Sequence, residues 1–236
     1  MKTGSELRLA VPEGTLILRP LHARAVRVRL EPPGASPETP NPALDPALAA
    51  ACPPAFSTQE SAEGVTLQTD RLRVLFDRAT GSLTFTTPEG HALLREIPGS
   101  RHLHPVTVQG VACHEVEQAF DSPRGERLHG LGQFQDGHAE LPSVPRRLIQ
   151  VNTQIAIPFY LSNRGYGLPW LQAGLTDFNP ADTFVPLVKD AVEGPLFSFT
   201  VTGSTGAFTD TGRTSTYEGG YRFPPRATTR STSTMA

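Results

Sequence analysis

The sequence predicts an all-β fold, an antiparallel β-sandwich built of short strands. The first observation behind this prediction is that the chain holds 23 prolines and 21 glycines in 236 residues. An interior proline destabilises a helix by about 3 kcal/mol and an interior glycine by about 1 kcal/mol, so few uninterrupted helical stretches remain. The second observation is a series of short apolar runs bounded by Gly, Pro, Asp and Ser, a pattern typical of half-buried strands joined by turns.

The expected strands follow one another from near the start of the chain to residue 171. They are interrupted by a proline-rich segment, residues 32–54, which we expect to be an exposed loop. The single helical candidate, residues 42–51, contains Pro46 and is interpreted as a linker or a single turn. The expected strands are residues 7–11, 15–18, 25–30, 65–68, 72–76, 83–86, 92–95, 106–111, 114–120, 127–131, 147–151, 155–162 and 166–171.

The last two of these strands form a hairpin in our interpretation. Asn163, Arg164 and Gly165 supply its short turn. Large apolar residues alternate with smaller or more polar ones along the first strand, which gives that strand one strongly apolar face. The residues of this face are Ile155, Ile157, Phe159 and Leu161.

The hairpin and the residues before it resemble a known family. The order Gly130-Leu-Gly-Gln133, Asn152-Thr153, Ile157-Pro-Phe159 and Ser162-Asn-Arg-Gly-Tyr-Gly-Leu168 is similar to the N-terminal β-domain of glycoside hydrolase family 31, the α-glucosidases and α-xylosidases. The xylosidase branch is the better match. The resemblance covers roughly residues 20 to 190 and implies a galactose mutarotase-like supersandwich. It departs at Pro169-Trp-Leu-Gln172, where the family usually reads Leu-Trp-Asp-Asn, and Pro169 predicts an edge or barrel-facing strand.

We expect one β-sandwich domain over residues 1–200, a length that buries a sizeable core. Residues 201–236 are rich in Ser and Thr and hold almost no large aliphatic residue. Such a segment buries too little apolar surface to offset the entropy lost on ordering. We expect a disordered tail or a truncated or frame-shifted end. The short runs 206–211 and 219–223 also resemble the first strands of a β-module inserted in the xylosidase branch.

Charge and hydropathy exclude several classes of partner. The formal net charge is −2 with both signs dispersed, which argues against nucleic acid. No run of about 18 apolar residues could span a membrane, and no apolar segment follows Lys2 as a secretory signal requires, so we expect a cytoplasmic protein. Cys52 and Cys113 lack metal-ligand spacing, and neither a metal nor a cofactor is expected.

No catalytic residue is assigned. A retaining glycosidase needs two carboxyl groups about 5 to 5.5 Å apart. The resemblance implies that both are aspartates on a (β/α)8 barrel, which takes roughly 250 residues, more than the whole chain. The family's Trp-x-Asp-Met type motif is also missing, because Leu171 and Gln172 follow the single tryptophan, Trp170. We expect the chain alone to be inactive, a fragment of a retaining α-glycosidase accessory to hydrolysis, with a catalytic barrel and a carbohydrate as its partners.

The polar residues after the Gly-Leu-Gly motif are the candidate carbohydrate-binding residues. Planar amides and aromatic faces suit sugars, and the resemblance implies that a loop of this domain reaches over the barrel. The other interpretation is that these residues cap strands and pack against the barrel. Asp136, His138 and Glu140 are interpreted as solvated turn residues, and His129 with His138 as no metal site. The candidates are Gln133, Phe134, Gln135, Asp136 and Asn152.

An alternative function is that of a free-standing sugar-binding or mutarotase-like β-domain. A mutarotase needs two histidines and a carboxylate that converge in the cleft of the sandwich. The residues that could supply them are His102, His104, His114 and Glu115. Their spacing matches no mutarotase motif.

Overall fold

The computed structural model describes residues 4–35, 41, 43–45, 47, 54–141, 144–171 and 174–179, together with the backbone of residues 2–3, 198–202, 211–216 and 227–235. Every named element is a strand, and every strand pair is antiparallel. This confirms the predicted all-β class. Six of the ten residues of the helical candidate, 42–51, fall outside the described residues, as does most of the proline-rich segment.

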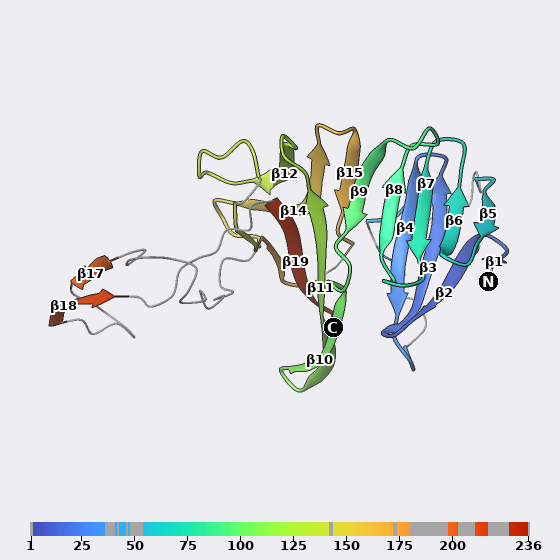
Figure 1. Cartoon of the computed structure of the whole chain (residues 1–236). Coiled ribbons are helices and arrows are strands. Elements are labelled where there is room, and N and C mark those ends of the chain that lie inside the picture. The colour runs from blue at the N-terminus through green and yellow to red at the C-terminus, as the bar shows by residue number, and fades with distance from the viewer. Residues whose placement is uncertain are drawn as a thin grey trace.

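A four-stranded sheet opens the chain, and its strands pair in sequence order (Figure 1). Apolar residues alternate with polar ones along its strands, so that one face carries leucines and the other carries arginines and glutamates. The strands are β1 (Lys2–Thr3), β2 (Glu6–Val11), β3 (Gly14–His22) and β4 (Ala25–Glu31).

The largest sheet in the described part of the chain has ten strands. Its order is β13-β16-β19-β11-β9-β8-β7-β6-β5, and β10 pairs with β11 as a separate ribbon. The ribbon extends away from the rest of the sheet at the lower edge of Figure 1. The strands are β5 (Ser57–Glu60), β6 (Gly64–Gln68), β7 (Arg73–Asp77), β8 (Leu83–Thr86), β9 (Ala92–Glu96), β10 (His102–Val108), β11 (Val111–Ser122), β13 (Arg146–Leu148), β16 (Thr176–Phe178) and β19 (Ala227–Met235).

A three-stranded sheet of order β12-β14-β15 carries the residues that resemble family 31. Its strands are β12 (Leu128–Gln133), β14 (Ile155–Ser162) and β15 (Tyr166–Pro169). The expected hairpin 155–171 is therefore confirmed, with β15 ending at Pro169. A further pair is formed by β17 (Ser198–Thr202) and β18 (Thr211–Thr216).

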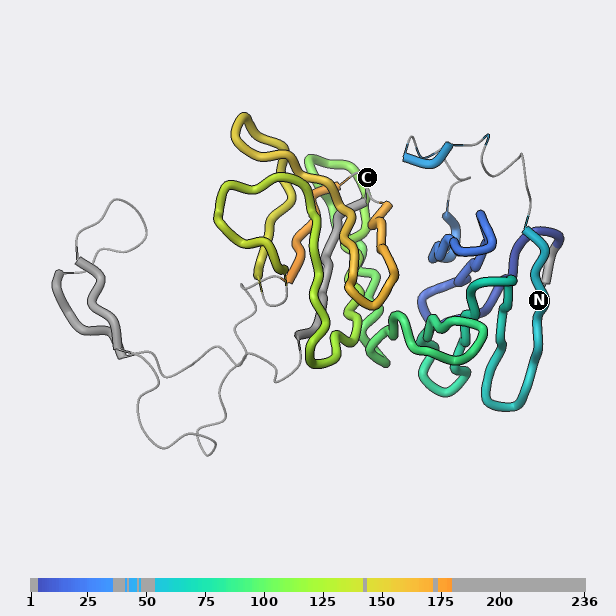
Figure 2. Tube along the Cα trace, turned by 90° about the horizontal axis from the view of Figure 1, so that it is seen from above, coloured from blue at the N-terminus to red at the C-terminus, as the bar shows by residue number. Residues whose placement is uncertain are grey.

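Two apolar clusters hold the layers together. In the first, Leu16 and Leu18 of β3 pack against residues such as Leu67 and Val74 of the long sheet. In the second, Tyr160 of β14 meets Phe178 of β16 with ring centroids 5.8 Å apart. Burying one such side chain contributes about 1.5 to 3 kcal/mol. The two smaller sheets thus cover different parts of one long sheet, and Figure 2 shows the first sheet, in blue, as a layer separate from β6–β8, in cyan.

Two predicted strands are wrong in whole or in part. Of residues 147–151, only 147 and 148 lie in a strand, β13, which ends at Leu148. Residues 106–111 do not form a single strand, because Gln109 and Gly110 turn the chain between β10 and β11. Both residues have positive φ, 50° and 83°, as a tight hairpin turn requires. The alternation of residues 106–111 thus belongs to the facing ends of two strands, where Val108 pairs with Val111.

The expectation for the tail stays a prediction. Most of residues 201–236 lie outside the described residues, as does Cys52. Within the tail the described parts are the last two residues of β17, β18 and the backbone of β19, which pairs with β11 and β16. Cys113 is buried and is not in a disulfide.

Candidate functional site

The Gly-Leu-Gly motif forms a β-bulge in β12. The register against β14 shifts between Gly130 and Gly132, and all three motif residues have positive φ, 134°, 65° and 99° in order. A Cβ on Gly132 would lie 1.9 Å from the carbonyl oxygen of Ile155. The bulge turns Leu131 into the second apolar cluster, where it is buried, and leaves Gln133, the residue after the motif, exposed. The motif therefore directs the chain into the polar loop that follows.

The loop after β12 folds back along that strand and is fixed at its far end. The backbone amide of Leu141 donates to the carbonyl oxygen of Leu128 at 2.8 Å, and the Leu141 side chain is buried. His129 Nδ1 lies 2.7 Å from the carbonyl oxygen of Ala139, a second tie between strand and loop. Residues 135–140 are exposed between these anchors, so the structure presents a short polar loop on a rigid base.

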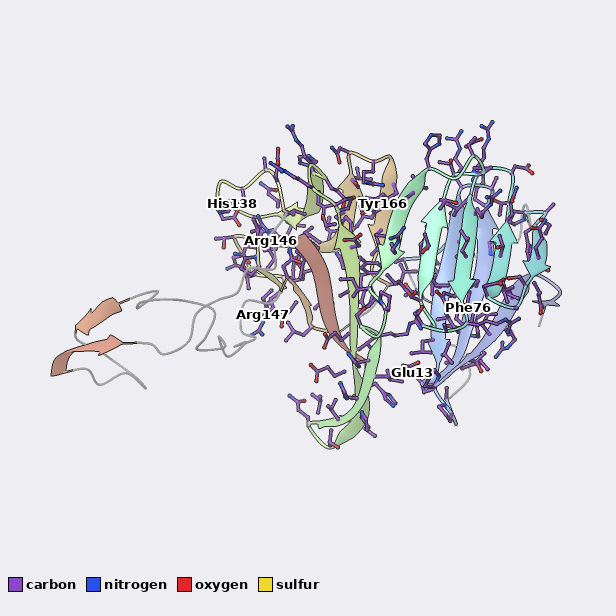
Figure 3. All side chains as sticks on the ribbon, viewed as in Figure 1. Glu13, Phe76, His138, Arg146, Arg147 and Tyr166 are labelled. Atoms are coloured by element: carbon purple, nitrogen blue, oxygen red, sulfur yellow. The ribbon has the colours of Figure 1, made fainter. Side chains whose placement is uncertain are left out.

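Arg146, the first residue of β13, lies under this loop. Its guanidinium stacks on the ring of Phe134 at 4.2 Å and donates from Nη2 to Asp136 Oδ1 at 3.0 Å. The Arg146 side chain is only 3 % exposed, and its Nε and Nη1 are buried without a hydrogen-bond partner. Figure 3 shows Arg146 closer to the sheets than His138, which lies on the outer part of the loop.

The electrostatics of Asp136 follow from this contact. Desolvation by itself would raise the pKa of the Asp136 carboxyl. Hydrogen bonds from the His138 amide and the Arg146 guanidinium, with the charge of Arg146, outweigh that effect and lower the pKa. Asp136 is therefore an anion that binds a cation, which is the opposite of what a general acid requires.

The five candidate residues lie at the two ends of the chain segment that connects β12 to β14. Gln133 pairs with Ile155, so β12 ends where β14 begins, and Asn152 lies in the turn just before β14. Gln133, Gln135 and Asn152 are exposed. In the described part of the chain no hydrogen bond joins one candidate to another. Phe134 is half-buried and Asp136 is bound to Arg146, so these two residues brace the loop.

The Ser-Asn-Arg-Gly-Tyr motif forms an anchor for the β14–β15 turn. Ser162 Oγ and Tyr166 Oη both donate to Oε1 of the buried Glu126, at 2.6 and 2.8 Å. The Asn163 side chain accepts from the Arg127 amide at 2.9 Å and donates to the Gly125 carbonyl at 3.2 Å. Arg164 donates to the carbonyl oxygen of Ala92 in β9. These contacts join the turn to the β11–β12 connection and to the long sheet.

Sequence reasoning missed Arg146 and Glu126. Each lies outside the family motifs, in the segments Val-Pro-Arg-Arg and Gly-Glu-Arg. A charged residue with no pattern around it predicts exposure, whereas both of these side chains are buried. The signal that could have found Glu126 is the pair of hydroxyl residues Ser162 and Tyr166, whose partner must be a nearby acceptor.

The histidines named for a mutarotase do not converge in a cleft. His102 and His104 stack with ring centroids 5.7 Å apart and lie opposite Glu117 and Glu115 on one face of the β10–β11 ribbon. Both histidines are exposed. His114 is the next residue along β11 and points to the other face of the ribbon. The sandwich interior near Tyr160 contains only a cavity of about 20 Å³, room for about one water molecule.

Two kinds of feature are absent from the described part of the chain. No group of three or more His, Cys, Asp or Glu side chains in that part of the chain has the arrangement needed to hold a metal ion. No helix there has the length and apolar character that a membrane crossing requires.

Comparison with known families matches residues 15–179 to the glycosyl hydrolase 31 N-terminal galactose mutarotase-like domain. The chain belongs to this family. The matched range includes both the bulge of β12 and the anchored turn of β14–β15, so the family 31 domain described above is the same unit that carries the candidate loop.

Curated relatives of the family 31 domain match over shorter stretches. An α-xylosidase from Saccharolobus solfataricus is 36 % identical over 69 residues, which cover 25 % of this chain and 9 % of that protein. An uncharacterised family 31 glucosidase from Pseudescherichia vulneris is 37 % identical over 57 residues, 24 % of this chain and 11 % of that protein. The matched stretches thus cover about a tenth of the curated relatives.

Solved structures agree on the fold of the family 31 domain. The family 31 α-xylosidase from Xanthomonas citri has a TM-score of 0.69 at 27 % identity, over 80 % of this chain and 20 % of that one. A family 31 α-xylosidase from a soil metagenome, complexed with xylose, has a TM-score of 0.58 at 21 % identity, over 75 % of this chain and 28 % of that one, and shows the fold alone. The supersandwich expected from the resemblance is therefore confirmed.

Proposed function

We propose that this chain is the non-catalytic N-terminal domain of a retaining glycoside hydrolase that acts on α-xylosides or α-glucosides. In this proposal a (β/α)8 barrel supplies the two catalytic carboxyl groups, and the domain supports carbohydrate binding by that barrel. The observation that carries the proposal is the likeness to the Xanthomonas citri α-xylosidase, which covers 80 % of this chain at 27 % identity.

The candidate loop gives the domain a way to contribute to a sugar subsite. Its amide side chains, Gln133, Gln135 and Asn152, are exposed at one end of the β12–β14 pair. Amides donate and accept hydrogen bonds in one plane, as sugar hydroxyls require. Arg146 fixes the loop through Phe134 and Asp136, so ordering the loop on binding costs little conformational entropy. In this proposal the amides contact substrate and the other two residues hold them in place.

A chimeric enzyme tests the proposal. The chain takes the place of the N-terminal domain in the Xanthomonas citri α-xylosidase, and kcat and KM are measured with aryl α-xylosides and aryl α-glucosides. We expect an active chimera in which Gln133→Ala or Asn152→Ala raises KM by about three- to tenfold, the effect of losing one hydrogen bond to a neutral group. Gln59→Ala in β5, an exposed amide outside the three-stranded sheet, is the matched control and leaves KM unchanged. An inactive but folded chimera would contradict the proposal.

A further inference from the structure

The candidate loop contains the single Asp-Gly dipeptide of the sequence, Asp136-Gly137, and the sequence has no Asn-Gly dipeptide. In an Asp-Gly pair the amide nitrogen of the glycine can attack the carboxyl carbon of the aspartate, because glycine has no Cβ to obstruct the approach and adopts unusual backbone conformations readily. A bond forms between Gly137 N and Asp136 Cγ. The Cγ–O bond to the carboxyl hydroxyl breaks, and the hydroxyl leaves with the amide proton as water. The product is a five-membered cyclic imide.

Hydrolysis of the imide completes an isomerisation. Water adds to one of the two ring carbonyls, and the bond from that carbonyl carbon to nitrogen breaks. Opening at the main-chain carbonyl leaves Gly137 joined to Cγ, so the aspartate methylene enters the main chain and the former main-chain carbonyl becomes a free carboxylate on Cα. The product is isoaspartate. One water leaves and one returns, so the mass is unchanged and the reaction needs no oxidant, reductant or other co-reactant.

The backbone around Gly137 has the freedom that this reaction needs. Residues 135–140 are exposed, and no backbone–backbone hydrogen bond ties them to the rest of the described chain. Gly137 has a φ of 77°, and a Cβ added to it would meet nothing within 4 Å. The loop is therefore held at its ends and by side chains, whereas its backbone can rearrange around Gly137.

The Asp136 carboxyl group, in contrast, is held in an unreactive state. Nη2 of Arg146 lies 3.0 Å from Oδ1 and 2.8 Å from Oδ2, and the His138 amide donates to Oδ1 at 3.2 Å. Burial opposes ionisation, but these hydrogen bonds and the charge of Arg146 outweigh it and lower the pKa of the carboxyl. A carboxylate resists the attack, because its oxygen leaves as water only after it is protonated. Ring closure also removes one of the two oxygens that Arg146 binds.

We propose that Asp136-Gly137 is a site of spontaneous isoaspartate formation and that Arg146 protects it. Arg146 suits this role because its side chain is only 3 % exposed and its guanidinium stacks on Phe134 at 4.2 Å, so the cation is fixed beneath the loop. In isoaspartate the free carboxylate sits directly on Cα and the main chain is one carbon longer, so the contact with Arg146 is lost and the loop is released. This proposal does not depend on the proposed function.

The test follows isoaspartate in the purified chain near pH 6 by peptide mapping with electron-transfer fragmentation, which distinguishes the two isomers of equal mass. The folded parent is compared with the parent unfolded in urea, with Arg146→Met and with Arg127→Met. Arg127 is the matched control, because its ion pair is with Glu140 of the same loop, at 3.6 Å. We expect Arg146→Met to isomerise about tenfold faster than the folded parent, the effect of losing one hydrogen bond between charged groups, and Arg127→Met to match the parent.

A pH profile separates protection by charge from protection by rigidity. The rate falls as pH rises through the carboxyl pKa, and the charged and titratable groups that act on this carboxyl are Arg146 and His138. We expect the fall at lower pH in the folded parent than in the unfolded chain, a measurement that needs no variant to fold. Equal rates in the folded parent and Arg146→Met, or equal pH profiles in the two states, would overturn the protective role. An unfolded chain that forms no isoaspartate here, or a rate in Arg146→Met that Gly137→Ala does not reduce, would overturn the site.

Discussion

The carboxylate of Asp136 binds the buried guanidinium of Arg146, whose Nη2 lies 3.0 Å from Oδ1 and 2.8 Å from Oδ2. The Arg146 side chain is almost fully buried and the Asp136 side chain is 39 % exposed, so a buried cation meets an anion at the surface. This contact fixes the candidate loop to β13. Because Asp136 is titratable, the stability that the contact contributes depends on pH.

The first prediction concerns acid. The pKa of Asp136 is lowered in the folded chain, so its contact with Arg146 stabilises the fold at pH values above the ordinary carboxyl value of 3.8 and is lost as pH falls through the folded pKa. Asp136→Asn removes this dependence. We expect the variant to be less stable than the parent near pH 7 and equally stable near pH 2, as measured by urea unfolding at each pH. A difference in stability that does not change with pH would contradict the assignment.

The second prediction concerns the two unpaired donors of Arg146. Arg146→Met keeps an unbranched side chain against Phe134 and removes the orphaned Nε and Nη1, so we expect stability to change by less than about 1 kcal/mol. Arg146→Ala leaves a cavity and is expected to cost about 2 to 3 kcal/mol. Both variants free Asp136, and amide exchange at residues 135–140 should become faster in both. If Arg146→Met costs as much as Arg146→Ala, the charge matters more than the packing.

The third prediction concerns alkali. Burial, followed by the hydrogen bond to the Glu126 carboxylate and the charge of that carboxylate, raises the pKa of the Tyr166 phenol well above its ordinary value of 10.0. The unfolded chain releases this proton first, so the stability that Tyr166 contributes is present below pH 10 and is lost as pH rises further. We expect Tyr166→Phe to cost about 1 kcal/mol near pH 7. The variant should also lose stability less steeply than the parent above pH 10, measured by denaturant unfolding.

The fourth prediction concerns the bulge. Gly132→Ala adds a Cβ that would meet the backbone of Ile155 at 1.9 Å in a residue with φ of 99°. Because backbone atoms cannot yield as a side chain does, we expect a loss of at least about 3 kcal/mol. Gly137 in the candidate loop also has positive φ, 77°, but its added Cβ would meet nothing within 4 Å. Gly137→Ala is the matched control and should cost about 1 kcal/mol, the price of the conformation alone. Equal losses would mean that the bulge tolerates a side chain.

The sequence predicted the strands of this fold well where alternation and turn residues agreed. Residues 155–169 are an example, since the apolar alternation and Asn163-Arg-Gly165 both specify the same hairpin. Alternation alone did not locate the turn at Gln109-Gly110, because the facing ends of two paired strands continue one pattern. It also did not tell which face of β14 is buried. That depends on Phe178 of β16 lying opposite Tyr160, which is not a local property of the sequence.

The sequence predicted where the candidate loop lies but not the roles of its residues. The motif residues Gly130, Gly132 and Ser162 indicated a polar loop and a turn, and both exist. The roles of Phe134 and Asp136 could not be predicted, because they depend on Arg146, which lies ten residues beyond Asp136 in a segment with no motif. Contacts across a loop are set by the path of the chain and leave no periodic signal.

The last prediction is that the purified chain does not hydrolyse aryl α-xylosides or aryl α-glucosides above background. A retaining glycosidase pairs an ionised nucleophile with an acid whose pKa is raised. The two carboxylates of the candidate loop do not supply this pair. Asp136 has a lowered pKa and binds Arg146, and the exposed Glu140 lies 3.6 Å from Arg127 in an ion pair.

Sugar binding by the chain alone should also be weak, because hydrogen bonds from an exposed loop merely replace those to water. The measurements are release of the aryl group and calorimetric titration with xylose. If the chain turned over such a substrate and Asp136→Ala or Glu140→Ala abolished that turnover, the loop would be a complete active site. Xylose affinity that appears only in the chimera, and that falls with Gln133→Ala, would instead place the loop beside the catalytic residues of another domain.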